Sequence, residues 1–251
     1  MNEYPGSLTV FNLDQCDSTN NYIKNRLDPL KDQFPVLVTS GLQTGGRGRH
    51  QRKWISPGEG KGLYSSFGFS LATNKNLHLL PLIAGISVIE ALGKVTGVDF
   101  HLKWPNDILY KEKKIAGILI ENVISDTQLL CITGIGINLN HKADDFPGDL
   151  AHKAVSLKMV TGLDYGIEEM NPVLSVVFFH WLEKLKSGAQ EEIIGKANGF
   201  SGHFRGKTIS FHQPSGDGIV SGIFKGINHD GGLILGMEKG APAVYYSGEI
   251  I

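Results

Sequence analysis

The sequence predicts an α+β fold in two parts, a larger one over residues 1–200 and a small all-β barrel over residues 201–251. Up to about residue 196, strand-like runs are interspersed with runs that have helical apolar spacing. Beyond that point the apolar runs are short, and Gly-, Pro-, Asn- and Asp-rich turns separate them. A length of 251 residues is sufficient for one main domain and one small one.

The strands of the larger part are predicted from apolar runs. Residues 63–71 alternate apolar with small side chains, as a strand does. The predicted strands span 8–13, 35–42, 63–71, 98–103, 108–110, 115–122 and 129–138. The pair 108–110 and 115–122 is predicted to form a hairpin around Lys111-Glu112-Lys113. Residues 43–61 contain five glycines and form a long loop, and loops of that length are usually functional or disordered.

Helices are predicted between these strands. Asp17-Ser18-Thr19-Asn20 supplies capping residues for a helix that runs to about residue 27. The most apolar stretch is residues 77–92, and polar residues and a proline interrupt it. It is too short and too polar to cross a membrane. We therefore predict a buried helix over 78–95. Two further helices are expected at 154–160 and 167–185.

The barrel is predicted from four short strand-like runs, at 207–211, 218–227, 232–237 and 243–247. Pro-Ser-Gly-Asp-Gly and Asn-His-Asp-Gly-Gly turns separate three of them. A closed sheet of about 50 residues fits this pattern.

Composition limits the classes of function. Lysine and arginine total 24 against 25 acidic residues, a formal net charge of −1, which argues against bulk attraction to nucleic acid. An anion site must therefore come from local clustering. Neither Cys16 nor Cys131 has the close Cys or His neighbours of a zinc site. The first residues lack the pattern of a signal peptide, so we expect a cytoplasmic, reducing location.

A basic, glycine-rich segment spans residues 45–54. It contains Arg47, Arg49, Arg52 and Lys53 next to Trp54, and no acid occurs between residues 41 and 58. Glycines let a backbone fold around a ligand, arginines bind carboxylate or phosphate, and a tryptophan suits a purine ring. The segment suggests a loop that wraps an anion and a base, and a solvated basic loop that contacts RNA is the alternative. No Gly-Lys-Ser/Thr follows, so it is not a P-loop.

Three further segments offer polar groups at strand ends. Lys103-Trp104-Pro105-Asn106-Asp107 presents a cation, an amide and a carboxylate from one rigid turn, which suits a nucleotide with magnesium or a purely structural turn. Lys114 opens an apolar strand and fits either a fixed cation over a pocket or a solvated strand end. Asn138 ends the strand 129–138, where an exposed amide reads a base edge or simply forms a turn.

Taken together, these segments resemble the biotin protein ligase family in residues and in order. The matching blocks are Asp17-Ser18-Thr19-Asn20, Gln43, Gly46-Arg47-Gly48-Arg49, Arg52-Lys53-Trp54, Lys103-Trp104-Pro105-Asn106-Asp107, Lys114-Ile115-Ala116-Gly117-Ile118-Leu119 and Gly134-Ile135-Gly136-Ile137-Asn138. The resemblance covers residues 14–140 and the tail past 200. It implies a mixed-sheet catalytic domain of the class II synthetase and biotin ligase type, followed by a small SH3-like β-barrel.

The resemblance also implies a two-step reaction. The biotin carboxylate attacks the α-phosphorus of Mg²⁺-bound ATP to form biotinyl-5′-AMP and pyrophosphate. A lysine of a biotin carboxyl carrier protein domain then attacks the anhydride and releases AMP. The implied catalytic residues are Lys114, Arg49 and Lys103. The implied biotin-binding residues are Ser18, Thr19, Asn20, Gln43, Arg47, Gly48, Arg49 and Lys114. The implied ATP-binding residues are Arg49, Arg52, Trp54, Lys103, Asn106 and Asn138, with Asp107 on the metal.

The sequence departs from the family pattern at two points, and each departure leads to an expectation. Gln51 stands where the family often has a glycine, which affects loop flexibility. No helix-turn-helix precedes residue 1, so we expect a ligase form without DNA binding, and the lack of a membrane-spanning apolar run gives the separate expectation of no membrane attachment. Because family members dimerise by joining sheets, a homodimer is one implied state. The alternative functions are a lipoate or octanoate ligase, which Ser18, Thr19 and Gln43 disfavour, and a nucleic-acid-binding module.

Overall fold

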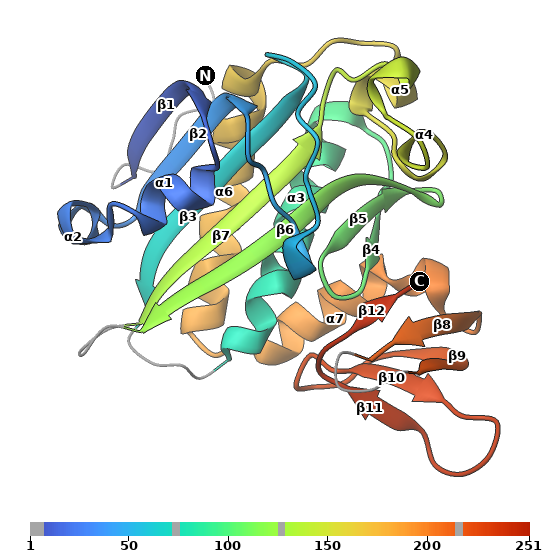
Figure 1. Ribbon diagram of the computed structural model, residues 1–251. Helices are drawn as coiled ribbons and strands as arrows, with labels where there is room; N and C mark the ends of the chain where they lie inside the picture. Colours follow the sequence, from blue (N-terminus) through green and yellow to red (C-terminus); the bar gives the residue numbers. More distant parts are fainter. Residues whose placement is uncertain (1–7, 72–75, 125–128, 214–217) are drawn as a thin grey trace.

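A seven-stranded mixed sheet forms the centre of the larger part (Figure 1). The structure is a computed structural model that describes residues 8–71, 76–124, 129–213 and 218–251. The strand order is β1-β2-β3-β7-β6-β5-β4. The bounds are β1 Thr9–Cys16, β2 Val36–Gln43, β3 Gly62–Leu71, β4 His101–Lys103, β5 Asp107–Tyr110, β6 Lys113–Ile124 and β7 Leu129–Asn138. The β1–β2 pair is parallel and the other pairs are antiparallel, which confirms the implied mixed sheet.

Long helices cover one face of this sheet, and short helices lie at its other face and its edges (Figure 1). The bounds are α1 Thr19–Lys24, α2 Leu27–Leu30, α3 Leu80–Thr96, α4 Leu150–Lys153, α5 Leu157–Thr161, α6 Ile167–Lys186 and α7 Gln190–Phe200. Helix α3 contacts α6, α7 and the sheet. Helix α1 lies on the opposite face, where Ile23 packs on Val36 and Val38.

The two faces of β3 differ because side chains alternate along a strand. Phe67 points to the long helices and stacks on Phe178 at 4.3 Å. Tyr64 and Ser66 lie on the other face, in register with Gly136 and Gly134 of β7. That second face carries polar groups and glycines, so it leaves room for a site.

The apolar helix is a core element of the fold. Among the described residues, one helix, Leu77–Thr96, is long and apolar enough to cross a membrane by length and composition alone. The expectation that the stretch is too short and too polar to cross a membrane was therefore wrong, whereas the buried helix predicted over 78–95 is confirmed. Two thirds of its most apolar window, 67%, is buried inside the protein. Burial against α6, α7 and the sheet accounts for its composition.

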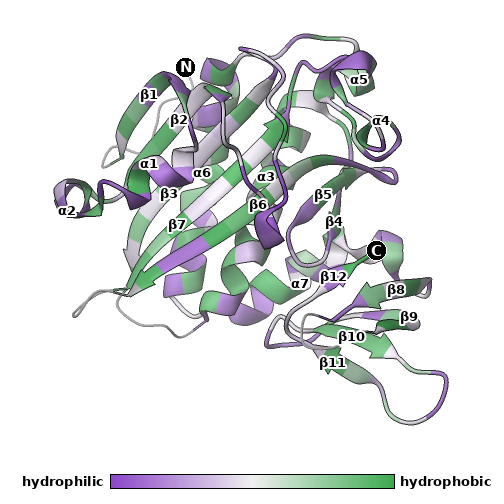
Figure 2. Ribbon diagram, in the orientation of Figure 1, coloured by the Kyte–Doolittle hydropathy of each residue, from purple (hydrophilic) through white to green (hydrophobic). Residues whose placement is uncertain are grey.

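The C-terminal part forms a five-stranded antiparallel sheet in the order β11-β10-β9-β8-β12. Its strands are β8 Thr208–His212, β9 Ile219–Ile227, β10 Leu233–Gly236, β11 Ala243–Tyr245 and β12 Glu249–Ile250. The indole of Trp104 donates to the carbonyl of Gly231 at 2.9 Å, and the hydroxyl of Ser201 donates to the carbonyl of Leu102 at 3.1 Å. One hydrophobic cluster runs through both sheets. Figure 2 shows green, hydrophobic segments on strands of both sheets. An SH3-like closure of this sheet stays a prediction.

Several predicted elements differ from the observed ones. The helix expected at 154–160 is present as α5, but it begins at Leu157, because the residues after α4 are extended and Ser156 caps α5. The first helix ends at Lys24 rather than near residue 27. Helix α7 was not predicted, because Gly195 and Gly199 interrupt its pattern. The two-residue strand β12 carries no periodic signal and was also missed.

Candidate functional site

A cavity of about 490 Å³ opens on the face of the sheet that α3 and α6 leave uncovered. The residues predicted from the sequence all line it. They are Ser18, Thr19, Asn20, Gln43, Arg47, Gly48, Arg49, Arg52, Trp54, Lys103, Asn106, Asp107, Lys114 and Asn138. The structure therefore brings the predicted set together, while the role of each residue stays a proposal.

Glycines form the floor of this cavity. Gly117 of β6 and Gly136 of β7 are paired in register, and the indole of Trp54 lies over both. A Cβ at Gly117 would come within 2.8 Å of the Trp54 ring, and one at Gly136 within 2.7 Å. Because real Cβ atoms do not approach so closely, only glycine lets the ring lie on the sheet.

Lys114 reaches the floor because β6 contains a β-bulge. The register with β5 shifts between Ile108 and Leu109, so that Ile115 is the extra residue. Without the bulge, Lys114 and Gly117 would point to opposite faces, whereas here Lys114 lies against Gly117. Its ammonium pairs with Asp107 Oδ1 at 2.6 Å and lies 5.4 Å from the Trp54 ring centre.

The basic segment is folded as a small hairpin. Gly48 N donates to the Arg52 carbonyl at 2.7 Å, and Trp54 N donates to the Gly46 carbonyl at 2.9 Å. A short 3-10 turn, Arg49–Gln51, forms its tip, which is purple in Figure 2 and lies in front of β6. Both tip residues after Arg49 have positive φ, 54° at His50 and 58° at Gln51. The tip therefore holds two side chains in the left-handed region that glycine prefers.

Arg49 points from this tip into the cavity. Its guanidinium donates to Asn106 Oδ1 at 3.1 Å, and Asn106 Nδ2 donates to the Ile118 carbonyl at 2.8 Å. Burial lowers the pKa of Arg49, against the positive effect of nearby Glu249 and Asp107, yet a guanidinium stays charged. The amide of Asn106 thus orients Arg49 as a fixed cation.

Glu249 brings the C-terminal sheet into the cavity wall. Its Oε1 lies 2.5 Å from Arg52 Nη1, although 197 residues separate the two along the chain. Burial alone would raise the pKa of Glu249, but its hydrogen bond to Arg52 and the charges of Arg52, Lys103 and Arg49 hold it below the usual value. Glu249 is therefore an anion among cations, and a ligand phosphate would compete with it.

Lys103 is a partly buried cation of the cavity. It stands beside Asp107, in register across the β4–β5 pair. Burial lowers its pKa, and the nearby carboxylates of Asp107 and Glu249 oppose that effect. A partly desolvated lysine interacts strongly with an incoming anion, because less water screens it.

The end of the cavity beside α1 is lined by hydrogen-bonding groups. Gln43 Oε1 accepts from the backbone of Thr19 at 2.8 Å and lies 3.2 Å from its hydroxyl. Ser18 caps α1, as predicted, and accepts from the backbone of Asn21. Arg47 donates to the Asn21 side chain. Apart from the Arg47 guanidinium, the groups named here are neutral donors and acceptors.

For Asn138 the sequence left an exposed amide and a turn-forming residue as alternatives. The amide is not exposed, because the residue is 5% exposed and Nδ2 donates to the Val155 carbonyl at 3.0 Å. The residue therefore ties the segment at 153–155 to the end of β7. Val155 N also donates to the Lys114 carbonyl at 3.0 Å, so this segment runs beside the lysine.

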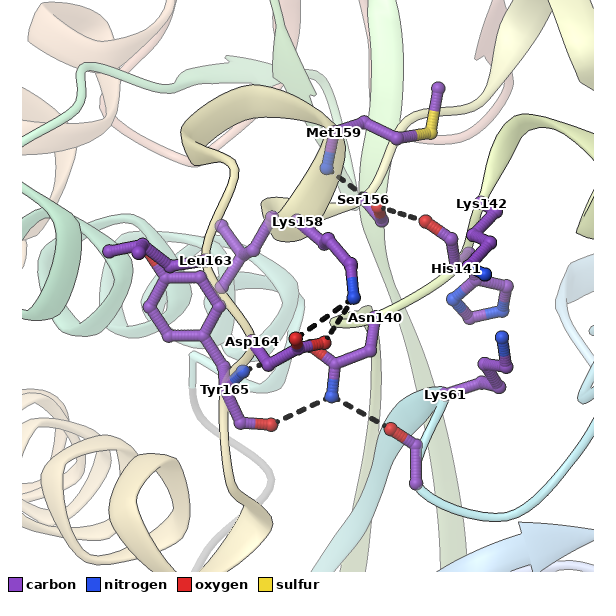
Figure 3. A network of polar contacts seen from close by, with 12 residues as sticks. Lys61, Asn140, His141, Lys142, Ser156, Lys158, Met159, Leu163, Asp164 and Tyr165 are labelled. Carbon is purple, nitrogen blue, oxygen red and sulfur yellow. Dashed lines mark hydrogen bonds and ion pairs between the residues drawn. The ribbon is translucent and has the colours of Figure 1, made fainter.

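A polar network holds the outer wall, residues 139–165 (Figure 3). Asn140 Nδ2 donates to the carbonyls of Gly60 and Tyr165, each at 2.9 Å. Ser156 donates to the His141 carbonyl at 2.6 Å, and Lys158 pairs with Asp164. The wall fixed in this way contributes Phe146, Leu150, Lys153 and Ala154 to the cavity.

Charge is concentrated in the cavity although the chain is nearly neutral. Seven lysines and arginines line it against three acidic residues. Local clustering thus produces an anion site, as the composition required.

Glu112 and Glu249 were not predicted as lining residues. A residue near the end of the chain gives no local signal that it meets the basic segment. Among the described residues, no group of three His, Cys, Asp or Glu side chains could hold a metal ion.

Fold and cavity define the class: an α+β protein whose mixed sheet carries a positively charged small-molecule site, with a small antiparallel sheet at one side. Residues 13–138 match the Biotin/lipoate A/B protein ligase family, and residues 206–251 match the Biotin protein ligase C terminal domain. The chain belongs to the biotin/lipoate A/B protein ligase family.

Individual relatives agree with that assignment. A biotin--[acetyl-CoA-carboxylase] ligase of Paracoccus denitrificans is 30% identical over 240 residues, covering 89% of this chain and 92% of that protein. The bifunctional ligase/repressor BirA of Bacillus spizizenii is 39% identical over 133 residues, but the match covers only 39% of its length. Biotin protein ligase from Aquifex aeolicus, solved in complex with biotin and ATP, superimposes with a TM-score of 0.80 and 33% identity over 97% of both chains.

Proposed function

We propose that the chain is an ATP-dependent biotin ligase that forms biotinyl-5′-AMP and transfers biotin to a lysine of a biotin carboxyl carrier protein domain. The observation that carries this proposal is the cluster of fixed cations over a glycine floor. The first step brings one anion onto another, so positive charge must offset their repulsion and stabilise the charge that develops on the α-phosphate. We assign this role to Lys114, Arg49 and Lys103, which all line the cavity.

Each substrate has a matching part of the cavity in this proposal. The ureido ring of biotin would bind at the neutral end, near Ser18, Thr19 and Gln43. The adenine would stack against Trp54, whose ring lies over the sheet glycines and lines the cavity. The carboxylate and the α-phosphate would then meet beside Lys114. The hairpin that carries Arg49 would exclude water from the labile anhydride.

Magnesium is the implied metal, and the residues present fit it. Mg²⁺ is usually held by one or two carboxylates together with substrate phosphates, rather than by a complete protein cage. Asp107 and Glu249 both line the cavity and supply such carboxylates. Asp107 would hold the ion, which would supply charge neutralisation on the phosphates.

Biotin is favoured over lipoate by the polar end of the cavity. Sites built from hydrogen-bonding groups reject analogues that lack the matching groups more strongly than apolar pockets do. The similarity to the Paracoccus and Aquifex biotin ligases supports the same choice. We further propose a domain boundary at 200/201, supported by the C-terminal family match at 206–251, and a cytoplasmic location, supported by the free thiols of Cys16 and Cys131.

Exchange of radiolabelled pyrophosphate into ATP tests the first step. We expect exchange that depends on biotin and is absent with lipoate or octanoate. Exchange with lipoate alone would support the rival ligase, and exchange with none of the acids would contradict the proposal. Transfer of labelled biotin to an isolated carrier domain tests the second step.

A further inference from the structure

We propose that Glu121 of β6 is a positioning residue that sets, through Asn20 and Ser66, the direction in which the Thr19 hydroxyl presents itself to the ligand. The inference rests on the proposed function, because it names the feature of biotin that the hydroxyl recognises, a ureido N–H. Neither Glu121 nor Ser66 lines the cavity, so neither touches the substrate.

A relay of hydrogen bonds connects Glu121 to Thr19 through Asn20 and Ser66. Its first link is the side chain of Asn20, a residue that is 3% exposed. This amide lies over Gly134, where an added Cβ would overlap its oxygen. Ser66 and Leu119 flank Gly134 in register on the neighbouring strands. Asn20 Nδ2 lies 2.9 Å from Glu121 Oε2 and 3.4 Å from the Leu119 carbonyl, and Oδ1 lies 2.6 Å from Ser66 Oγ.

Glu121 determines which end of the Asn20 amide faces Ser66. The opposite orientation would place Oδ1 against a carboxylate and a carbonyl, which have no proton to donate. Burial alone would raise the pKa of Glu121, but hydrogen bonds from Asn20 and Lys24 hold it below the usual value. Glu121 is therefore ionised, Nδ2 points to it, and Oδ1 points to Ser66.

The number of available protons then determines where the Thr19 hydroxyl donates its proton. Ser66 Oγ lies 2.6 Å from Asn20 Oδ1 and 2.7 Å from Thr19 Oγ1, but it carries one proton. Because the amide oxygen only accepts, the Ser66 proton goes to Asn20. The proton between the two hydroxyls must then come from Thr19. Gln43 Oε1 remains bonded to the backbone N–H of Thr19 at 2.8 Å, and its longer contact with the Thr19 hydroxyl, at 3.2 Å, then receives no proton.

The consequence is an acceptor facing the cavity. With its proton committed to Ser66, Thr19 Oγ1 presents lone pairs to the ligand, which complement an N–H donor. A ureido ring carries two such N–H groups, and a dithiolane ring carries none. Glu121 thereby contributes to substrate selection without touching the substrate.

Calorimetric titration with carbamate analogues of biotin tests the relay. In each analogue one ureido N–H is replaced by oxygen, and both positions are made. We expect the wild-type chain to bind one of the two analogues at least roughly tenfold more weakly than it binds biotin, because two acceptors then face each other. In Glu121→Ala the Asn20 amide can turn, Thr19 can donate, and this penalty should shrink severalfold.

Further variants separate positioning from general damage. Ser66→Ala breaks the relay at a small buried site and should reduce the penalty in the same way. Glu121→Gln keeps an acceptor beside Asn20 and should retain the wild-type penalty. Glu192→Ala, which removes the carboxylate of an exposed ion pair with Lys184 at 2.8 Å, is the matched control and should change nothing.

The outcomes are distinguishable. An equal penalty in wild type, Glu121→Ala and Ser66→Ala would overturn the relay while leaving biotin binding intact. A wild-type chain that binds neither biotin nor the analogues would instead contradict the proposed function. Loss of the penalty in Glu121→Gln would also overturn the relay, because the variant keeps the acceptor on which it depends.

Discussion

The position of Lys114 depends on one extra residue in its strand. The bulge at Ile115 turns Lys114 onto the glycine floor, while the preceding Lys113 does not line the cavity. Two adjacent lysines in the sequence therefore have different surroundings. This contrast allows a matched test of the fixed-cation idea.

Lys114→Ala should slow biotin-dependent pyrophosphate exchange by on the order of 10²–10³, because a preorganised cation at the reacting phosphate is lost. The free energy of unfolding should change little, since the ammonium is partly exposed. Lys113→Ala serves as control and should exchange normally. Equal rates for both variants would contradict the role of Lys114.

His141 makes the outer wall sensitive to acid. Its ring is fully buried and stacks on Phe146 at 4.9 Å, and burial lowers its pKa to about 4. The unfolded chain binds this proton near the ordinary pKa, so stability present at neutral pH is lost as pH falls from about 6.5 towards 4.

We expect this linkage to cost up to roughly 3 kcal/mol of unfolding free energy between pH 7 and pH 4. Denaturant unfolding at a series of pH values measures it. His141→Gln should show a shallower dependence on pH over this range. An unchanged slope in that variant would place the acid sensitivity in another residue.

At the scale of the element, the paired glycines of β6 and β7 determine how closely the Trp54 ring approaches the sheet. Gly136→Ala should push Trp54 off the floor, because the new Cβ would lie within 2.7 Å of the ring. We expect the KM for ATP in the exchange reaction to rise about tenfold, since stacking on an aromatic contributes roughly 1–3 kcal/mol per base.

Gly195→Ala in α7 is the control for a glycine in open space, where no atom lies within 4 Å. It should stabilise the helix by about 0.5–1 kcal/mol and leave the KM for ATP unchanged. A Gly136→Ala variant with normal KM would show that Trp54 does not need the floor.

Sequence patterns predicted the elements whose signal is local. The strand at 129–138 has its observed bounds because a long apolar run ends at Asn138. The predicted site residues all line the cavity because they occur in contiguous family-like blocks, whereas other lining residues, such as Phe146 and Leu150 of the outer wall, were not predicted. Ser66 was not identified, since its neighbour Ser65 is equally polar and only the register with β7 shows which one faces the site. Glu249 was missed because its partner lies 197 residues away.

At the scale of the whole molecule, the two sheets share one hydrophobic core. Trp104 joins them, as it is 2% exposed and its indole donates to the Gly231 carbonyl. The site depends on this junction, since Glu249 enters the cavity wall from the C-terminal sheet. We therefore expect both parts to unfold together.

Unfolding followed by circular dichroism and by tryptophan fluorescence should give coincident transitions. Trp104→Phe should lower the free energy of unfolding by about 1–3 kcal/mol, because the Gly231 carbonyl loses its buried donor. Two separate transitions in the wild-type chain would contradict a shared core.

The central claim is that immobile positive side chains let two small anions meet in one cavity. Calorimetric titration with biotin, alone and with a non-hydrolysable ATP analogue, tests it most directly. The account predicts one biotin bound per chain, with binding retained when the nucleotide is present. Absence of biotin binding under both conditions would contradict it.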